Sequence, residues 1–323
     1  MIKVGLIGCG FMGAMHANCY RSLAGVEVAA VADIRPEKAA ALAQGATVYA
    51  DGMDLIAEAD VDVIDICLPT FLHAKYALAA MDKVRYVFVE KPVALTVNEG
   101  EAMLAKAREV GCFVQVGQVI RFWDEYVALR DMVKSNKYGR VVNANFRRIS
   151  PRPDWGWQDW LLDASLSGGA AQDLHIHDID YVLSVFGEPE AFFSVKNTLS
   201  ETNSYVNTLL RYHDKAITVE GTWDLPGCHP FEATFRVVFE KAVVENAGGK
   251  FLLYTNDGVE EIVLEKATVG TAAAGGNISD LGGYYNELKY FCEKVAAGEP
   301  IEQATLADGV SSLKFLKKEL SFV

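Results

Sequence analysis

The sequence predicts an α/β fold, in which an N-terminal, doubly wound parallel sheet precedes a C-terminal α+β domain with a large, mostly antiparallel open sheet. Up to about residue 121, short apolar runs alternate with helical stretches through short connections, as a parallel sheet requires. After residue 190, long strands follow one another through turns such as 213–215 and 256–258, which indicates antiparallel pairing. The 323 residues are enough for two cores, and we place the domains at 1–121 and 122–323.

The first domain is predicted to alternate strands and helices. Each strand is a short apolar run rich in β-branched residues, which is typical of strands buried on both faces. Pro36 suits the first turn of a helix, because its missing N–H costs little there. The expected strands are 2–7, 26–32, 47–50, 61–68, 86–90 and 113–117, and the expected helices are 14–23, 36–44, 54–59, 72–81 and 96–110.

The second domain is predicted to be a sheet with a helix packed on one face. That helix covers 170–186 and stops at Gly187. Alternating apolar residues suggest that the other face of the sheet meets another subunit, so we expect a homodimer or homotetramer. The expected strands are 140–149, 191–199, 204–213, 216–224, 231–240, 242–246 and 251–254, and the other helices are 124–134, 284–297 and 306–320.

Composition and charge exclude several classes of protein. The net charge of −13 argues against nucleic acid or an anionic membrane as a partner, because phosphate binding needs a basic face. The six cysteines are scattered without paired spacing, which is typical of reduced thiols in a cytoplasmic protein. No apolar stretch reaches the roughly 18 residues of a membrane span. The glycine pattern that begins at Gly8 also argues against a signal peptide.

That glycine-rich turn follows the first predicted strand. Gly8 lets the chain turn out of the strand, Gly10 lets the backbone approach a pyrophosphate, and Gly13 permits close packing of helix on strand. The N–H groups and dipole of the following helix then hold the phosphates. Asp33 ends the second strand, where it can accept hydrogen bonds from the adenosine ribose. Together these elements predict a Rossmann dinucleotide-binding site.

Arg35 bears on the choice of cofactor. A cation just past the acid can hold the 2′-phosphate of NADP, whereas the Asp33 carboxylate repels that phosphate. The sequence therefore favours NAD over NADP.

Two further segments, 68–70 and 90–92, lie at the carboxyl ends of predicted strands. Ligands of doubly wound sheets bind beyond these ends, so both segments are expected to border the same crevice as the glycine turn. Pro92 fixes the backbone at Lys91 and directs its charge into the crevice, although an isolated lysine is most often a surface charge. His73 either lines the cofactor pocket or packs structurally.

The helix predicted over 170–186 carries acids and histidines close together. On an α-helix Asp173 and His177 share one face, and Asp180 continues the same stripe. Such an Asp–His pair suits proton transfer, because the carboxylate orients the imidazole. The alternatives are polar residues on the helix surface or a buried structural pair. His175 and His177 have the ligand type of a zinc or iron site, but they diverge on a helix, so we predict no metal.

Taken together, these residues resemble the family of glucose–fructose oxidoreductase, inositol dehydrogenase and MocA. The resemblance covers nearly the whole chain: VGLIGCGFMG with Asp33, the LPTFLH segment, Glu90-Lys91-Pro92, and residues 116–122 and 167–180. It implies an NAD-binding Rossmann domain over 1–121 and a substrate-binding and oligomerisation domain over 122–323. One departure is His175, which stands where the family usually has Gly.

The resemblance implies an NAD-dependent dehydrogenase acting on a CH–OH group of a cyclic polyol, sugar or sugar derivative. Lys91, Asp173 and His177 match the family's catalytic positions. His177 would accept the hydroxyl proton, Lys91 would stabilise negative charge on that oxygen, and Asp173 would hold His177 or Lys91 in place. The implied cofactor-binding residues are Gly8, Gly10, Phe11, Met12, Gly13, Asp33, Arg35, Leu68, Pro69, Thr70, His73, Glu90, Lys91 and Pro92.

The resemblance leaves the substrate less defined than the reaction. Asp180 matches a position that contacts polyols in inositol dehydrogenases, and tryptophans suit stacking on a sugar face. The expected substrate-binding residues are Arg121, Trp155, Trp157, Gln158 and Asp180. Two alternatives remain open: a glycoside hydrolase of the same fold that recycles bound NAD, and a non-catalytic nucleotide-sensing regulator.

Overall fold

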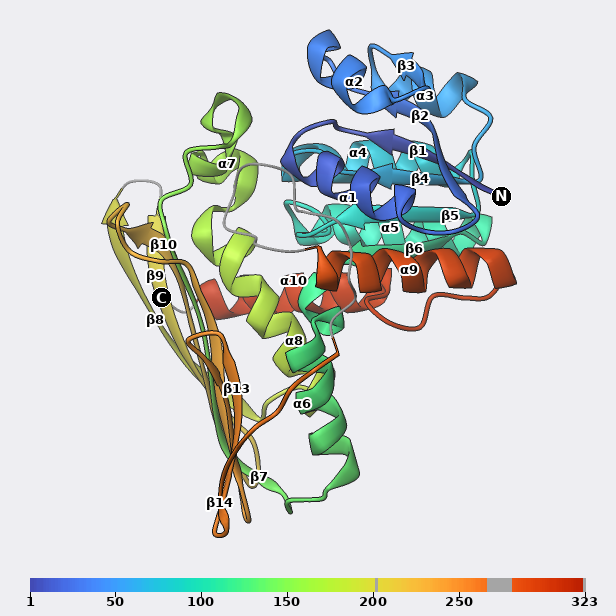
Figure 1. The fold of residues 1–323 in the computed structure, drawn as a ribbon. Coiled ribbons are helices and arrows are strands. Elements are labelled where there is room, and N and C mark those ends of the chain that lie inside the picture. The colour runs from blue at the N-terminus through green and yellow to red at the C-terminus, as the bar shows by residue number, and fades with distance from the viewer. Residues whose placement is uncertain (201–202, 266–280, 322–323) are drawn as a thin grey trace. The chain divides into compact units, whose positions relative to one another are not determined.

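The computed structural model describes residues 1–200, 203–265 and 281–321, and it divides into two compact units (Figure 1). The first unit holds Met1–Phe122 and the described residues 281–313, and the second holds the remaining described residues from Trp123 onward. The limit read from the sequence, between residues 121 and 122, lies one residue before the first of these borders. The C-terminal helices differ from the prediction, because α9 (Gly282–Ala297) and the first part of α10 (Leu306–Leu320) belong to the first unit.

The first unit is built on a parallel sheet of six strands, as predicted. The strand order is β3-β2-β1-β4-β5-β6, so the direction of winding reverses between β1 and β4 and makes their carboxyl ends a topological switch point. The strands are β1 (Ile2–Ile7), β2 (Val26–Ala32), β3 (Thr47–Tyr49), β4 (Val63–Ile66), β5 (Tyr86–Glu90) and β6 (Phe113–Gly117).

Helices cover both faces of this sheet (Figure 1). Local sequence fixes their ends: Thr96 and Glu99 form a reciprocal capping box before α5, and Gly111 ends that helix in the left-handed region. The helices between the strands are α1 (Phe11–Arg21), α2 (Pro36–Ala43), α3 (Gly52–Glu58), α4 (Thr70–Met81) and α5 (Val97–Val110), and a 3₁₀ turn, Val119–Phe122, follows β6.

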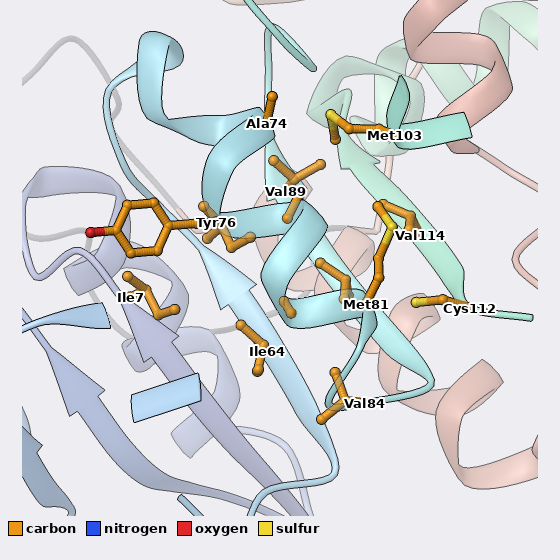
Figure 2. Packing of buried hydrophobic residues seen from close by; sticks show 14 of the residues in the cluster. Ile7, Ile64, Ala74, Tyr76, Met81, Val84, Val89, Met103, Cys112 and Val114 are labelled. Carbon is orange, nitrogen blue, oxygen red and sulfur yellow. The ribbon is translucent and has the colours of Figure 1, made fainter. Parts of the chain in front are cut away.

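One face of the sheet packs a dry core against α4, α5 and α10. Figure 2 shows Ile64, Val89 and Val114 from neighbouring strands meeting Met81 and Met103 from the helices. Fully burying such side chains contributes about 2 kcal/mol each, so this layer is a main source of stability. The opposite face packs on α1 and α9 and also carries polar side chains, which are described below.

The second unit contains an eight-stranded sheet in the order β14-β13-β12-β11-β7-β10-β9-β8. All pairs are antiparallel except β7 with β10, so the predicted mostly antiparallel open sheet is confirmed. The strands are β7 (Val141–Pro151), β8 (Ala191–Ser200), β9 (Asn203–Arg211), β10 (Ala216–Leu225), β11 (Glu232–Phe239), β12 (Val243–Ala247), β13 (Lys250–Thr255) and β14 (Gly258–Glu261).

Helices α6 (Asp124–Ser135), α7 (Ala164–Ser167) and α8 (Ile176–Phe186) lie on one side of this sheet (Figure 1). Aromatic rings join the layers: Tyr126 of α6 packs on Tyr181 of α8 at 4.8 Å and on Phe235 of β11 at 5.0 Å between ring centroids. No helix among the described residues is long and apolar enough to cross a membrane.

Candidate functional site

The glycine turn between β1 and α1 has the geometry that a pyrophosphate site needs. Gly8 has a φ of +97°, and a Cβ there would lie 2.4 Å from the carbonyl oxygen of Cys67. A Cβ on Gly13 would lie 1.9 Å from the carbonyl oxygen of Gly8, so the helix approaches the strand only because no side chain intervenes. Gly10 precedes α1, whose N-terminus has neither a side-chain cap nor an acid in its first turn. The turn therefore fits the phosphates of a dinucleotide.

Replacing Gly13 and Gly10 separately by alanine is expected to distinguish folding from cofactor binding. Gly13→Ala should destabilise the protein by about 2 kcal/mol or more, because backbone must move to admit the methyl group. Gly10→Ala should leave stability nearly unchanged, since its Cβ meets only the Arg35 guanidinium at 3.8 Å. It should still weaken NAD binding, because the methyl group occupies the approach to the pyrophosphate. Urea denaturation and NAD titration measure both effects, and wild-type NAD affinity in Gly10→Ala would contradict this placement.

Asp33 follows β2 and is held by a dense set of donors. Its carboxylate accepts hydrogen bonds from the Cys9 N–H at 2.8 Å and from the Arg35 guanidinium through Nε and Nη2, both at 2.8 Å. Burial opposes ionisation of Asp33, but these hydrogen bonds lower its pKa, so it is a carboxylate at neutral pH. Burial, helped by the nearby Asp33, raises the pKa of Cys9 to about 12, which keeps that thiol neutral beside the turn.

His73 of α4 ties two strand ends together. Its ring nitrogens lie 2.7 Å from the carbonyl oxygens of Leu68 and Pro92, and the side chain is 1% exposed. Burial lowers the pKa of His73, which favours the neutral ring, and a neutral ring can donate to only one of the two carbonyl oxygens. These contacts give His73 a packing role, and its place in the cofactor pocket stays a prediction. Pro69 is the N-cap of α4 and Thr70 its first residue, so this helix begins two residues earlier than predicted.

Lys91 directly follows β5, where a carboxylate holds its backbone. Its N–H donates to Glu90 Oε2 at 3.0 Å, and the Lys91–Pro92 peptide bond is cis. Gly117 of β6 gives the Glu90 carboxylate room, because a Cβ there would lie 3.0 Å from it. The predicted cofactor residues of the first unit thus lie at the carboxyl ends of β1, β2, β4 and β5.

Arg121 was expected to bind substrate. It lies in the 3₁₀ turn after β6, where its Nη1 is 3.2 Å from the Asp308 carboxylate of α10.

In the second unit, Asp173, His177 and Asp180 lie on consecutive turns. His177 is 8% exposed, Asp180 is fully buried, and Asp173 is partly buried. His177 and Asp180 are therefore not polar residues of a helix surface, which was one of the alternatives.

The predicted continuous α-helix over 170–186 is incomplete, because Ala171–His175 form a π-helical turn before α8. A π-turn holds more residues than an α-turn, so the α-helical spacing assumed for Asp173 and His177 does not apply as stated.

Buried contacts fix this π-helical turn in place. His175 Nε2 lies 3.0 Å from Glu319 Oε1 near the end of α10, and both side chains are fully buried. A Cβ on Gly221 of β10 would lie 2.7 Å from the His175 Cβ, so the glycine allows the turn to approach the sheet. Asp178 of α8 pairs with Arg148 of β7 at 2.8 Å. π-Turns are frequent at functional sites, in line with the roles predicted for Asp173 and His177.

The tryptophan-rich loop before α7 presents apolar surface next to this segment. Trp155 is 46% and Trp157 is 36% exposed. Gln158 has a φ of +51° and Asp159 of +55°, a strained conformation that non-glycine residues adopt mainly where surrounding structure demands it. Leu161 of this loop packs in a buried cluster with Ala170 and Trp223. Because Ala170 directly precedes the π-helical turn, the loop packs against the start of the segment that carries Asp173.

A buried polar cluster in the first unit was not predicted. His16 of α1 lies 2.8 Å from Asp65 of β4 through Nδ1 and 3.0 Å from Glu90 of β5 through Nε2. The Tyr20 hydroxyl donates to the same Asp65 oxygen at 2.8 Å. His16, Asp65 and Cys67 also have metal-ligand atoms within 4.8 Å of one another. One feature of the sequence could have revealed this cluster: Asp65 lies inside β4, whereas strands buried on both faces are usually apolar throughout.

These features first define a class: a parallel sheet in the order 3-2-1-4-5-6, with a glycine turn after its first strand and an acid after its second, is a Rossmann dinucleotide-binding fold. The chain belongs to the GFO/IDH/MocA family of oxidoreductases. Residues 2–118 match the model of the oxidoreductase family with an NAD-binding Rossmann fold, and residues 126–245 match that of the GFO/IDH/MocA C-terminal domain. The resemblance read from the sequence is confirmed.

Individual relatives cover part of the chain. An inositol 2-dehydrogenase from Pseudomonas savastanoi pv. phaseolicola is 37% identical over 185 residues, which are 54% of this chain and 53% of that protein. A glucose-6-phosphate 3-dehydrogenase from Bacillus subtilis is 26% identical over 233 residues, covering 70% and 64%. The chain thus spans about half the length of curated relatives such as the first.

Among solved structures, an oxidoreductase from Agrobacterium radiobacter in complex with NAD+, L-tartaric acid and magnesium has the same fold. Its TM-score is 0.87 at 17% identity, over 99% of this chain and 95% of that one.

Proposed function

We propose that this protein is an NAD-dependent dehydrogenase that oxidises a secondary alcohol of a cyclic polyol, sugar or sugar derivative. Two things support the proposal: the chain belongs to a family of oxidoreductases and has a glycine turn that fits a dinucleotide, and by resemblance Lys91, Asp173 and His177 match that family's catalytic positions. A protein that only senses the nucleotide needs no groups for proton transfer.

In the proposed reaction, the substrate hydroxyl gives its proton to the imidazole of His177 while hydride leaves the carbinol carbon. NAD, when bound, supplies the hydride acceptor. The ammonium group of Lys91 orients the hydroxyl and stabilises the negative charge that develops on its oxygen. Asp173 orients His177 or Lys91. The neighbouring carboxylate, Asp180, is proposed to contact the substrate beside His177.

The tryptophan loop supports a polar ring as the substrate. Trp155 and Trp157 offer exposed aromatic faces, which stack on the apolar faces of sugars, and Gln158 offers an amide for hydroxyl groups. The names of relatives point the same way, since they act on inositol and glucose-6-phosphate.

A panel of inositols, hexoses and hexose phosphates, assayed with NAD and with NADP, tests the proposal. NADH formation on at least one of them is expected. Release of an aglycone from a glycoside without net NADH would replace the proposal by the NAD-recycling glycoside hydrolase. NAD binding with no turnover on any compound would favour the regulator.

NAD is the proposed cofactor, and Asp33→Ala is expected to shift the preference towards NADP. The substitution removes the acceptor for the ribose hydroxyls and releases the Arg35 guanidinium, which can then pair with a 2′-phosphate. We expect the ratio of kcat/KM for NAD over NADP to fall by about tenfold or more, which is about 1.4 kcal/mol.

Adding Arg35→Ala to Asp33→Ala is the matched control and should remove the gain with NADP. A wild-type protein that prefers NADP would overturn the assignment of Asp33.

We also propose that the protein is cytoplasmic and assembles into a homodimer or homotetramer through the open sheet of the second unit. Phe193 of β8 is 69% exposed and lies directly opposite Leu209 of β9, which is 43% exposed, so the two form an apolar pair on one face. Phe193→Glu should lower the mass measured by light scattering, and an unchanged mass would place the interface elsewhere.

A further inference from the structure

The buried cluster around His16 has an unusual charge balance for the interior of a parallel sheet. Asp65 and Glu90 carry two carboxylates on the face that packs against α1, and their side chains are 0% and 7% exposed. His16 lies between them and is fully buried. Two buried carboxylates without a compensating charge are strongly unfavourable, so the cluster needs a cation.

The geometry at His16 Nε2 indicates that this cation is the imidazole ring itself. The 3.0 Å separation from Glu90 Oε1 is an ion-pair distance, but the contact lacks the alignment of a hydrogen bond. Such a contact is far more favourable with a charged ring than with a neutral one. On the other side, the 2.8 Å distance from Nδ1 to Asp65 is that of a hydrogen bond between the ring and the carboxylate.

The surroundings of the ring agree with a charged state. Burial by itself disfavours the imidazolium, but Cys67 and Asp65 outweigh it and hold the pKa of His16 well above its ordinary value of 6.5. Burial also raises the pKa of Cys67, whose Sγ lies 3.3 Å from His16 Nδ1. The other groups around the ring are Tyr20 of α1, Phe88 and Glu90 of β5, and Tyr284 of α9, with Glu287 of α9 farther away towards Cys19.

One side chain, that of Glu90, connects the cluster to Lys91, the proposed catalytic lysine. Glu90 Oε1 faces His16, while Glu90 Oε2 accepts the N–H of Lys91 at 3.0 Å. We propose that His16 is a positioning residue: a buried imidazolium that balances Asp65 and Glu90 and thereby holds the Glu90 carboxylate on the backbone of Lys91. This inference rests on the proposed function for the role of Lys91, but the charge of His16 and the restraint of the backbone are properties of the fold alone.

His16→Gln is the informative variant, because glutamine keeps an N–H near the position of Nε2 and has no charge. With the charge lost, Glu90 is expected to leave the Lys91 N–H. A displacement of about 1 Å at a catalytic group costs up to about a hundredfold in rate. We therefore expect kcat to fall at least about tenfold, with the KM for NAD changed little.

Tyr20→Phe is the matched control: it removes a donor to Asp65 in the same cluster without touching Glu90, so it should lower stability but keep kcat within about twofold. Equal loss of kcat in both variants, or an unchanged kcat in His16→Gln, would contradict the positioning role.

Three measurements test the inference without measuring turnover: ¹⁵N-histidine NMR, hydrogen exchange of the Lys91 amide, and the dependence of the Tm on pH. In ¹⁵N-histidine NMR at pH 8, one of the six imidazoles should have both ring nitrogens protonated, and that signal should vanish in His16→Gln. Hydrogen exchange of the Lys91 amide should become faster in His16→Gln and stay unchanged in Tyr20→Phe.

Because the folded pKa of His16 is raised, its stabilisation is complete below pH 6.5 and is lost as pH rises towards that folded value. The Tm of the wild type should therefore fall relative to that of His16→Gln above pH 6.5. A neutral ring at pH 8, with Lys91 exchange unaffected, would overturn the inference. Loss of turnover on every panel substrate, with these signatures intact, would instead overturn the proposed function.

Discussion

Lys91→Met is expected to lower kcat on the order of a thousandfold while NAD still binds with an affinity within a few-fold of wild type. Methionine keeps the length of the side chain but cannot donate to an alkoxide, and loss of one such donor costs about 10²–10³ in kcat. Backbone contacts should survive, because the hydrogen bond to Glu90 is donated by the Lys91 main-chain N–H, which methionine keeps. Steady-state rates and fluorescence titration of NAD measure the two effects.

Lys134→Met, at an exposed position in the last turn of α6, is the control for removing a lysine and should keep full activity. Substantial turnover by Lys91→Met would remove Lys91 from the mechanism and leave the reaction without an electrophilic group in the first unit.

His177→Ala is also expected to have a large effect, a fall in kcat of about 10²–10⁴, because the hydroxyl proton loses its acceptor. The loss should shrink as pH rises, since hydroxide in the vacated space can take the proton. Added imidazole should restore part of the rate for the same reason. Neither treatment should rescue Lys91→Met, whose missing group is a donor. A pH–rate series for the two variants with the best panel substrate tests this difference.

His213→Ala is the matched control, because that imidazole lies in the turn between β9 and β10 and its side chain is 94% exposed. Its kinetics should equal those of wild type. A His177→Ala enzyme with wild-type kcat at neutral pH would leave His177 as a buried structural histidine.

Those parts of the fold that depend on neighbouring residues in sequence were predictable. The alternation of strands with helices up to β6, and the turns of the antiparallel sheet, depend on periodicity and on glycine and proline, which act locally. Membership of α9 in the first unit was not predictable, since it depends on packing against α1 across more than two hundred residues of chain. The parallel pairing of β7 with β10 is non-local for the same reason.

In the candidate site, too, locally determined features were predictable and features that depend on distant contacts were not. Gly8 and Gly13 were identified because steric need alone dictates glycine there, and the structure places backbone oxygens where their Cβ atoms would be. The role of His16 could not be read from the sequence, because Asp65 and Glu90 are far from it in the chain and meet it only across two strands. The π-turn at Ala171–His175 was hidden as well, since it arises from the close approach of His175 to Gly221.

The position of β7 in the middle of the large sheet constrains how the second unit folds. Its neighbours are β10 and β11, which follow it by some seventy residues or more, whereas β8–β9–β10 and β11–β14 each pair with strands next to them in sequence. Hairpins close in microseconds, but contacts between distant segments must first overcome the entropy of a long loop. The two hairpin arrays are therefore expected to form first, with β7 left as an unpaired strand at least until β10 has been synthesised. During that interval its apolar side chains are open to self-association, so expression at lower temperature or with chaperones should raise the soluble yield.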